Sequence, residues 1–259
     1  MKVVILCGGL GTRLREETEF RPKPMVPVGN RPIVWHIMKF YAHYGFKEFI
    51  LCLGYKGEVI KDYFRNYQWY SSDVTLKLGP VPQITYHNQH PEEDWQVTLL
   101  DTGQSTQTGG RVRRALAYIP DDEFLLTYGD GLCNVNVAEL IRFHHKNGGL
   151  ATLTAVRPSG RFGELSLSGD AITSFREKPE TESGYVNGGF FVVNKKIGDY
   201  LPNDASIFEF DALPRVAEAG KLHAFRHDAF WQCMDNPREM EILNKLWQQG
   251  QAPWKVWPD

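Results

Sequence analysis

The 259-residue chain has only four cysteines, carries almost no net charge and contains no long apolar run. The cysteines, Cys7, Cys52, Cys133 and Cys233, include no close pair, which excludes a zinc ribbon or a dense disulfide framework. Because 29 basic residues nearly balance 31 acidic ones, no general attraction to nucleic acid or to an anionic membrane is expected. Any anion site must therefore be local.

Membrane attachment is not expected either, because no apolar run approaches the roughly 20 residues that cross a bilayer. The chain enters the apolar run Val3–Leu6 without a charged leader or a cleavage site, which predicts a soluble, cytoplasmic protein. The composition, 42% hydrophobic and 23% charged, is that of an ordinary globular protein. We expect one domain over residues 1–259.

Short β-branched runs alternate with amphipathic segments, a pattern typical of βαβ units. The predicted fold class is α/β: a Rossmann-like, mostly parallel mixed sheet flanked by helices, with a more β-rich second half. Strands are expected over 3–7, 49–53, 123–127, 150–156, 164–168, 172–176 and 190–193, and helices over 32–44, 56–67, 110–119 and 137–146. Ligands of such sheets bind beyond the carboxyl ends of the strands, so the residues just after Leu6 and Leu126 form the candidate site.

The first expected strand runs into a glycine-rich loop, Gly8-Gly9-Leu10-Gly11-Thr12-Arg13-Leu14. Without side chains, the backbone of such a loop can approach a phosphate closely and offer successive N–H donors to it. A glycine-rich turn alone can also be purely structural. The loop therefore predicts an anion site only in combination with the residues on its C-terminal side.

The segment after the loop lacks acidic residues, since no Asp or Glu occurs between Phe20 and Lys47. A dinucleotide site needs an acid about 20 positions on to hold a ribose hydroxyl, and a third glycine where Leu14 stands. A Walker A loop needs Gly-Lys-Ser or Gly-Lys-Thr after four intervening residues, and this is also missing. These absences disfavour an NAD-dependent oxidoreductase and a P-loop NTPase.

The loop followed by Pro22-Lys23-Pro24 resembles the sugar nucleotidyltransferase family, which has a glycine-rich loop with Thr-Arg-Leu and then Pro-Lys-Pro. The resemblance implies that Arg13 and Lys23 are catalytic and bind the phosphates of a nucleoside triphosphate. It also assigns the backbone around the loop to the nucleotide, at Leu6, Gly8, Gly9, Gly11 and Thr12. The combination of the two motifs is far more specific than either alone.

Two aspartates are candidate ligands for Mg²⁺, which binds to one or two carboxylates together with phosphate oxygens and water. Asp130 stands between Gly129 and Gly131, where Asp-Gly can also be a plain turn. The resemblance makes Asp130 a catalytic metal ligand and places Gly129 beside the nucleotide. Asp235 resembles the second metal-binding aspartate of the family, although its position alone would indicate a helix N-cap.

Three later stretches, 160–165, 177–179 and 186–190, resemble the sugar-phosphate side of the family. The resemblance implies that Lys178 meets the sugar phosphate and that Glu164, Asn187 and Gly188 bind the sugar. From the residues alone, the first and third stretches can equally be hairpin turns, and Glu177-Lys178 can be a solvated charge pair.

The likeness is closer to the cytidylyltransferases of the family in four stretches: 101–103, 108–111, 231–235 and 252–255. It covers essentially the whole chain and implies that Thr102 and Arg111 bind CTP. A cation near the start of a helix is otherwise unfavourable, and a bound phosphate would resolve that conflict. Departures at 206–214, and Cys233 where a proline is expected, leave the identity of the sugar less certain than the chemistry.

The resemblance thus implies transfer of a cytidylyl group from CTP to glucose 1-phosphate, giving CDP-glucose and pyrophosphate. Residues 1–135 are expected to bind mainly the nucleotide and residues 136–259 mainly the sugar phosphate. The alternatives are a uridylyl- or thymidylyltransferase, a cytidylyltransferase for another sugar phosphate, and a non-catalytic nucleotide-sugar sensor. The resemblance also implies a homo-oligomer, and Trp247, Trp254 and Trp257 indicate either ordinary packing or a subunit interface.

Overall fold

The computed structural model describes the chain except residues 88–93, 159–163, 169–170, 177–183 and 259, with the backbone alone for 164–168 and 171–176. The central sheet has the strand order β13-β10-β14-β8-β1-β4-β7, and β15 pairs with β10 beside this path. Strand β1 (Val3–Cys7) lies between β8 (Glu123–Tyr128) and β4 (Glu48–Leu53), parallel to both. Strand β7 (Gln96–Asp101) extends this parallel part beyond β4.

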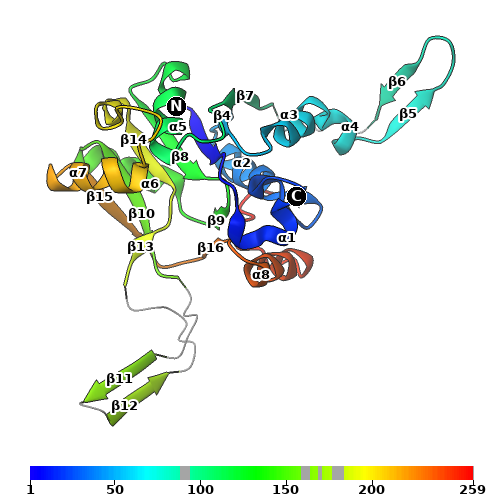
Figure 1. Ribbon diagram of the computed structural model, residues 1–259. Helices are drawn as coiled ribbons and strands as arrows, with labels where there is room; N and C mark the ends of the chain where they lie inside the picture. Colours follow the sequence, from blue (N-terminus) through cyan, green and yellow to red (C-terminus); the bar gives the residue numbers. More distant parts are fainter. Residues whose placement is uncertain (88–93, 159–163, 169–170, 177–183, 259) are drawn as a thin grey trace.

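The second half of the chain makes the sheet mixed. Strand β14 (Phe191–Asn194) pairs antiparallel with both β8 and β10 (Ala151–Val156), and β13 (Val186–Asn187) pairs antiparallel with β10. Strand β15 (Leu222–His227) is parallel to β10. The predicted fold class, a mostly parallel mixed sheet with helices around it, is confirmed (Figure 1).

Helices cover the sheet on both sides because consecutive residues of its central strands are apolar, so both faces of the sheet are apolar. Val3 and Ile5 of β1 belong to one buried cluster, while Val4 and Leu6 belong to another. The helices are α1 (Arg15–Thr18), α2 (Ile33–His43), α3 (Gly57–Arg65), α4 (Tyr67–Ser71), α5 (Thr108–Ala115), α6 (Val137–Asn147), α7 (Leu213–Glu218) and α8 (Pro237–Gln248). Among the described residues, no helix is long and apolar enough to cross a membrane.

Short elements complete the chain and shape the site. Two small pairings lie near the loop end of the sheet, β2 (Pro27–Val28) with β3 (Arg31–Pro32) and β9 (Gly131–Cys133) with β16 (Trp231–Cys233). Two hairpins, β5 (Val74–Lys77) with β6 (Gln83–Tyr86) and β11 (Glu164–Ser168) with β12 (Ala171–Arg176), stand outside the central sheet. Figure 1 shows the β5–β6 hairpin projecting away from the body.

The predicted elements lie where they were expected, with shifted ends. The helix expected over 110–119 begins at Thr108 and ends at Ala115, and the helix expected over 56–67 is divided into α3 and α4. Strands β5, β6, β7 and β15 were not predicted. The C-terminal aromatic residues pack inside the subunit: Trp254 is fully buried, and Trp247 and Trp257 are partly buried against the same cluster.

These tryptophans surround a buried histidine, His36 of α2. Its Nε2 donates to the carbonyl of Val28 at 2.9 Å, and its Nδ1 accepts from Nε1 of Trp254 at 3.3 Å. Both contacts suit a neutral ring, because a second ring proton would face the Trp254 donor. Burial lowers the pKa of His36 from 6.5 to about 4.

A lowered histidine pKa makes folding sensitive to acid. Between pH 6.5 and 4, His36 is protonated in the unfolded chain but stays neutral in the folded one. The free energy of unfolding therefore falls as the pH falls through this window. We expect this residue to account for up to about 3 kcal/mol of the loss, at about 1.4 kcal/mol per pKa unit. Urea unfolding of the wild type and of His36→Gln at pH 7 and pH 4.5 measures it. Equal losses in both proteins would contradict the assignment.

Candidate functional site

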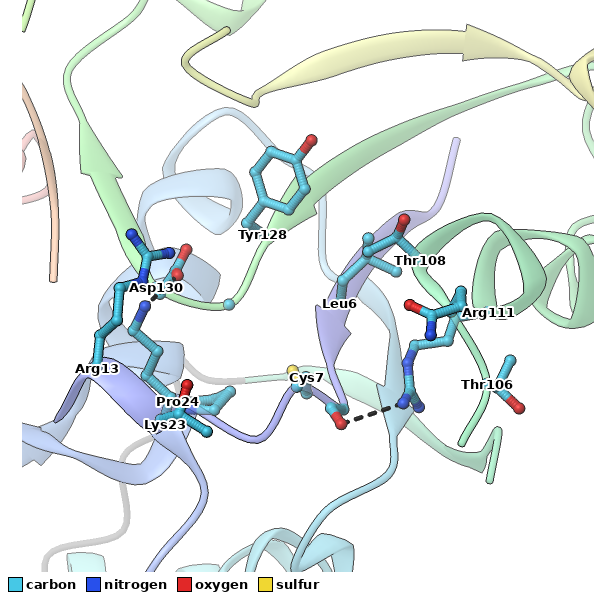
Figure 2. A pocket seen from close by; sticks show the side chains of 16 residues that line it. Leu6, Cys7, Arg13, Lys23, Pro24, Thr106, Thr108, Arg111, Tyr128 and Asp130 are labelled. Atoms are coloured by element: carbon cyan, nitrogen blue, oxygen red, sulfur yellow. Dashed lines mark hydrogen bonds and ion pairs between the residues drawn. The ribbon is translucent and has the colours of Figure 1, made fainter. Parts of the chain in front are cut away.

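Four charged side chains from three distant parts of the chain meet beyond the carboxyl ends of β1 and β8. Nζ of Lys23 donates to Oδ2 of Asp130 at 2.6 Å and also to Oδ1 of Asp235. Nη1 of Arg13 lies 2.8 Å from Oδ2 of Asp235. Figure 2 shows Arg13, Lys23 and Asp130 gathered on one side of the pocket. The structure thus brings together all four residues that were predicted to carry the chemistry.

The Lys23 ammonium is the buried centre of this cluster, with its side chain only 12% exposed. Burial alone would lower the pKa of Lys23, but the charges and hydrogen bonds of Asp130 and Asp235 outweigh burial and raise its pKa above 10.5. Lys23 is therefore protonated at neutral pH. Since Arg13 is mostly exposed, it is the cation of the cluster that is open to solvent.

Close backbone packing places Lys23 beside Asp130. The backbone N–H of Gly129 donates to the carbonyl of Leu6 at 3.0 Å, which holds the turn after β8 against the end of β1. A Cβ on Gly129 would lie 2.9 Å from both the Leu6 carbonyl and Cγ of Pro24. Only a glycine at position 129 therefore lets the Pro22-Lys23-Pro24 turn pack against the turn after β8.

The position of Asp235 depends on the start of α8, and here the alternative prediction of an N-cap was wrong. Asn236 is the N-cap, and its Oδ1 accepts from the backbone N–H of Glu239 at 3.1 Å. Glu239, only 6% exposed, accepts from the backbone N–H of Asp235 at 2.6 Å. The spacing of Asn236 and Glu239 is close to that of a capping box, a sequence signal that could have identified Glu239.

The residues around the cluster could hold a divalent cation. Asp130 and Asp235 both direct a carboxylate oxygen at one cation, the Lys23 ammonium, so two hard oxygen donors already converge. Among the described residues, Cys233, Asp235 and Glu239 also place possible ligand atoms within 4.8 Å of one another. Glu239 is already used by the Asp235 backbone, so the pair Asp130 and Asp235 fits a cation shared with phosphate oxygens better.

Arg111 ties the glycine-rich loop to the neighbouring strand ends. Its guanidinium donates to the carbonyls of Leu53 at 2.8 Å and Gly8 at 3.1 Å, and to Oγ1 of Thr102 at 2.6 Å. Arg111 and Thr102 are both buried. Carbonyl oxygens therefore already accept from this cation near the start of α5, and the assignment of Arg111 and Thr102 to CTP stays a prediction.

Two cavities meet at the charged cluster. The first, which we call the loop cavity, has a volume of about 290 Å³ and is lined by the glycine-rich loop together with Lys23, Thr108, Arg111 and Gly129. The second cavity, of about 210 Å³, is lined among others by Asn187, Gly188, Trp231 and Asp235. Arg13, Tyr128 and Asp130 line both. The site thus consists of two adjoining spaces with charged groups at their junction.

Most of the predicted site residues line one of these cavities. The loop cavity includes Leu6, Gly8, Gly9, Gly11, Thr12, Arg13, Lys23, Arg111, Gly129 and Asp130. Thr102 does not line it, because it is fully buried behind Arg111. Glu164 begins β11, but its side chain lies outside the part of the chain that is described, as does Lys178 entirely. Sequence reasoning had not assigned a role to Tyr128 or Thr108, which face these cavities (Figure 2).

Comparisons with known proteins show what the chain is similar to. The Nucleotidyl transferase family matches residues 2–248. A glucose-1-phosphate cytidylyltransferase from Salmonella typhi is 50% identical over 258 residues, which cover 99% of this chain and 100% of that protein. A probable glucose-1-phosphate cytidylyltransferase from Bacillus subtilis is 46% identical with the same coverage. The crystal structure of HddC from Yersinia pseudotuberculosis complexed with GMP-PN has a TM-score of 0.68 at 26% identity, covering 95% of this chain and 99% of that one.

The first two loop glycines differ in what surrounds them, which separates folding from binding. A Cβ on Gly8 would lie 2.0 Å from Nη1 of Arg111, whereas a Cβ on Gly9 would meet nothing within 4 Å. We expect Gly8→Ala to displace Arg111 and lower the free energy of unfolding by about 2 kcal/mol. Gly9→Ala is expected to change it by less than about 0.5 kcal/mol.

Ligand binding completes this comparison. If the loop backbone meets phosphate, the methyl group of Gly9→Ala occupies the space of the ligand and removes the thermal stabilisation that a nucleoside triphosphate gives the wild type. Differential scanning calorimetry with and without CTP measures both quantities. A Gly9→Ala protein stabilised by CTP as strongly as the wild type would show that the ligand binds away from this loop.

Proposed function

The chain belongs to the nucleotidyl transferase family, and from this premise we propose that it joins CTP to glucose 1-phosphate, forming CDP-glucose and releasing pyrophosphate. One observation carries the proposal. Relatives named for this activity match the chain from end to end at 46–50% identity. The charged cluster at the junction of two cavities supports the same conclusion.

The reaction needs positioning and charge neutralisation more than covalent help from the protein. An oxygen of the sugar phosphate attacks the α-phosphorus of CTP in line with the departing pyrophosphate, so one P–O bond forms as another breaks. Two adjoining cavities suit this geometry, with one substrate in each. We assign the nucleotide mainly to residues 1–135 and the sugar phosphate mainly to residues 136–259, because the second cavity draws on Asn187, Gly188 and Trp231.

The triphosphate belongs in the loop cavity. There the backbone of Gly8–Thr12 offers N–H donors, and Arg13 and Lys23 supply positive charge. Lys23 is held by two carboxylates, and we propose that it exchanges one of them for a phosphate oxygen when CTP binds. Arg111 lines the same cavity, so it can contact the nucleotide from beneath the loop while Thr102 holds its guanidinium in place.

The enzymes of this family use a divalent metal, and we propose that here it is Mg²⁺ bound by Asp130 and Asp235. Mg²⁺ suits a site with two carboxylates and several substrate oxygens, and it would neutralise charge on the reacting phosphates. Once the ammonium of Lys23 moves to phosphate, the two carboxylates retain a cation partner. Before the substrates arrive, the ammonium of Lys23 keeps the two acids together, and the metal would take over that role afterwards.

Sugar recognition is assigned to the second cavity. The amide Nδ2 of Asn187 donates to the hydroxyl of Tyr128 at 3.1 Å, and Nε1 of Trp231 donates to the carbonyl of Gly188 at 2.8 Å. These contacts hold Asn187 and Gly188 at the wall of the cavity, where they can meet sugar hydroxyls. Glu164 and Lys178 are proposed for the sugar and its phosphate from the family resemblance alone.

The activity is tested by pyrophosphate release. The wild type is mixed with glucose 1-phosphate, Mg²⁺ and one of CTP, UTP, dTTP, ATP or GTP, and we expect release with CTP only. Asp130→Asn removes charge but little volume, and we expect it to lower kcat at least about 100-fold because a metal ligand is lost. Asp121→Asn, at an acid that pairs with the chain's amino terminus, is the control and should leave kcat unchanged.

The outcomes of this panel separate the possible functions. Release with another base would move the assignment to a sister enzyme, and release only with another sugar phosphate would change the acceptor. A protein that releases no pyrophosphate with any pair would be a sensor that binds nucleotide sugars without reacting. An Asp130→Asn enzyme as active as the wild type would remove Asp130 from the chemistry.

We also propose that the chain forms a homo-oligomer through the β5–β6 hairpin. Four apolar side chains on this projecting hairpin are largely exposed: Leu76, Leu78, Val81 and Ile84, with Leu78 reaching 84%. Leu76 and Ile84 pair across the two strands, and exposed apolar side chains gathered on one element are typical of a contact between proteins. All four cysteines are free, which supports a reducing, cytoplasmic location for the assembly.

Light scattering coupled to size exclusion tests the assembly. We expect the wild type to elute with the mass of several chains, and Leu78→Glu to shift it toward a single chain, because a charge would be buried at the contact. Gln83→Glu adds the same charge on the same hairpin at a polar position and should keep the assembly. A wild type that elutes as one chain at micromolar concentration would refute the proposal.

A further inference from the structure

A chain of hydrogen bonds joins the two cavities through a residue that lines neither of them, Glu209. The hydroxyl of Tyr128 donates to Oε1 of Glu209 at 2.6 Å, and Oγ1 of Thr108 donates to Oε2 at 2.6 Å. Thr108 lines the loop cavity, while Tyr128 lines both cavities. One carboxylate therefore connects groups on the two sides of the site.

The position of Glu209 is fixed by the elements around it. Glu209 belongs to the short π-helical turn Phe208–Ala212, and Oγ1 of Thr108 also accepts from the backbone N–H of Phe208 at 2.9 Å. The buried ring of Phe208 packs edge-on against Phe191, whose ring packs in the same way against Tyr128. The turn that carries Glu209 is therefore linked to the Tyr128 ring by aromatic packing as well as by the hydrogen bond.

The contacts set the direction of the hydrogen bonds. An ionised carboxylate can only accept, so the Tyr128 hydroxyl must donate to Glu209. A tyrosine hydroxyl is protonated at neutral pH, so it has a hydrogen to donate. The tyrosine oxygen is then left as an acceptor, and it receives Nδ2 of Asn187. The other amide atom, Oδ1 of Asn187, is already used by the backbone N–H of Gly189 at 3.0 Å.

We propose that Glu209 is a positioning residue for the sugar phosphate, acting through Tyr128 and Asn187. It makes the wall of the second cavity present the remaining lone pair of the Tyr128 oxygen as an acceptor, beside a donor at the second amide hydrogen of Asn187. A sugar hydroxyl, which donates one hydrogen bond and accepts others, matches this pair. The proposal rests on the proposed function, because it assigns the second cavity to the sugar phosphate.

Glu209→Gln tests this direction of hydrogen bonding with almost no change in volume. Its amide has a single oxygen, so it can accept from Tyr128 or from Thr108 but not from both in the native arrangement. We expect the KM for glucose 1-phosphate to rise about 10-fold, with the KM for CTP changed less than about 2-fold. A general loss of folded structure would not raise the KM for one substrate while leaving the KM for the other nearly unchanged.

A double-mutant cycle with Tyr128→Phe shows whether Glu209 acts through the tyrosine. Tyr128→Phe removes the hydroxyl, and we expect Glu209→Gln to raise the KM for glucose 1-phosphate no further in that background. Asp211→Asn is the matched control: Asp211 lies in the same turn and accepts only from the backbone N–H of Ile207, at 2.6 Å among the contacts described. It should change the melting temperature without changing the ratio of the two KM values.

Two results in an active enzyme would overturn the role of Glu209. One is that Glu209→Gln and Tyr128→Phe raise the KM for glucose 1-phosphate additively; the other is that Glu209→Gln raises the KM values for glucose 1-phosphate and CTP equally. If Glu209→Gln does not fold, Tyr128→Phe alone carries the test, and equal KM increases for both substrates would contradict the proposal. A wild type that releases no pyrophosphate with any nucleotide would instead refute the proposed function. The two failures are therefore distinguishable.

Discussion

The ammonium group of Lys23, held between the carboxylates of Asp130 and Asp235, is the contact on which the site depends. Two acids that close together would repel each other in a partly buried place, and removing the cation between them would take from Asp130 the cation with which it pairs. Three separate segments must therefore converge: the turn at Pro22–Pro24, the turn after β8, and the end of β16. The fold can be understood as the framework that brings these three segments to one point.

Glycine and arginine contacts then determine what lies around that point. Gly129 allows the Pro22–Pro24 turn and the end of β1 to pack against the turn after β8, and Gly8 leaves room for Arg111, whose guanidinium bonds to the ends of neighbouring strands. Arg111 therefore supports the loop through the carbonyl of Gly8, while the loop also lines a cavity. This arrangement leaves backbone N–H groups and the exposed Arg13 available for an anion, as nucleotidyl transfer requires.

The sequence predicted what depends on local pattern and less of what depends on distant pairing. Short apolar runs identified β1, β4 and β8, and the resemblance of the loop, Lys23 and Asp130 to the motifs of the sugar nucleotidyltransferase family implied the chemistry. Strand β7 was missed because it is an edge strand with only partly buried side chains, so its apolar signal is weak. Glu209 was missed because its partners, Thr108 and Tyr128, lie 101 and 81 positions away. A phosphate was offered as the partner of Arg111 because its carbonyl partners, Leu53 and Gly8, are 58 and 103 positions away in the sequence.

The proposed mechanism depends most on a metal ion that Asp130 and Asp235 hold with the nucleotide once Lys23 turns to phosphate. Electron paramagnetic resonance of Mn²⁺, titrated into the protein with a non-hydrolysable CTP analogue, tests it without any turnover. We expect a tightly bound ion that depends on the nucleotide and is lost both in Asp130→Asn and in Asp235→Asn. Binding of Mn²⁺ with unchanged affinity in both variants would contradict this role of the two aspartates.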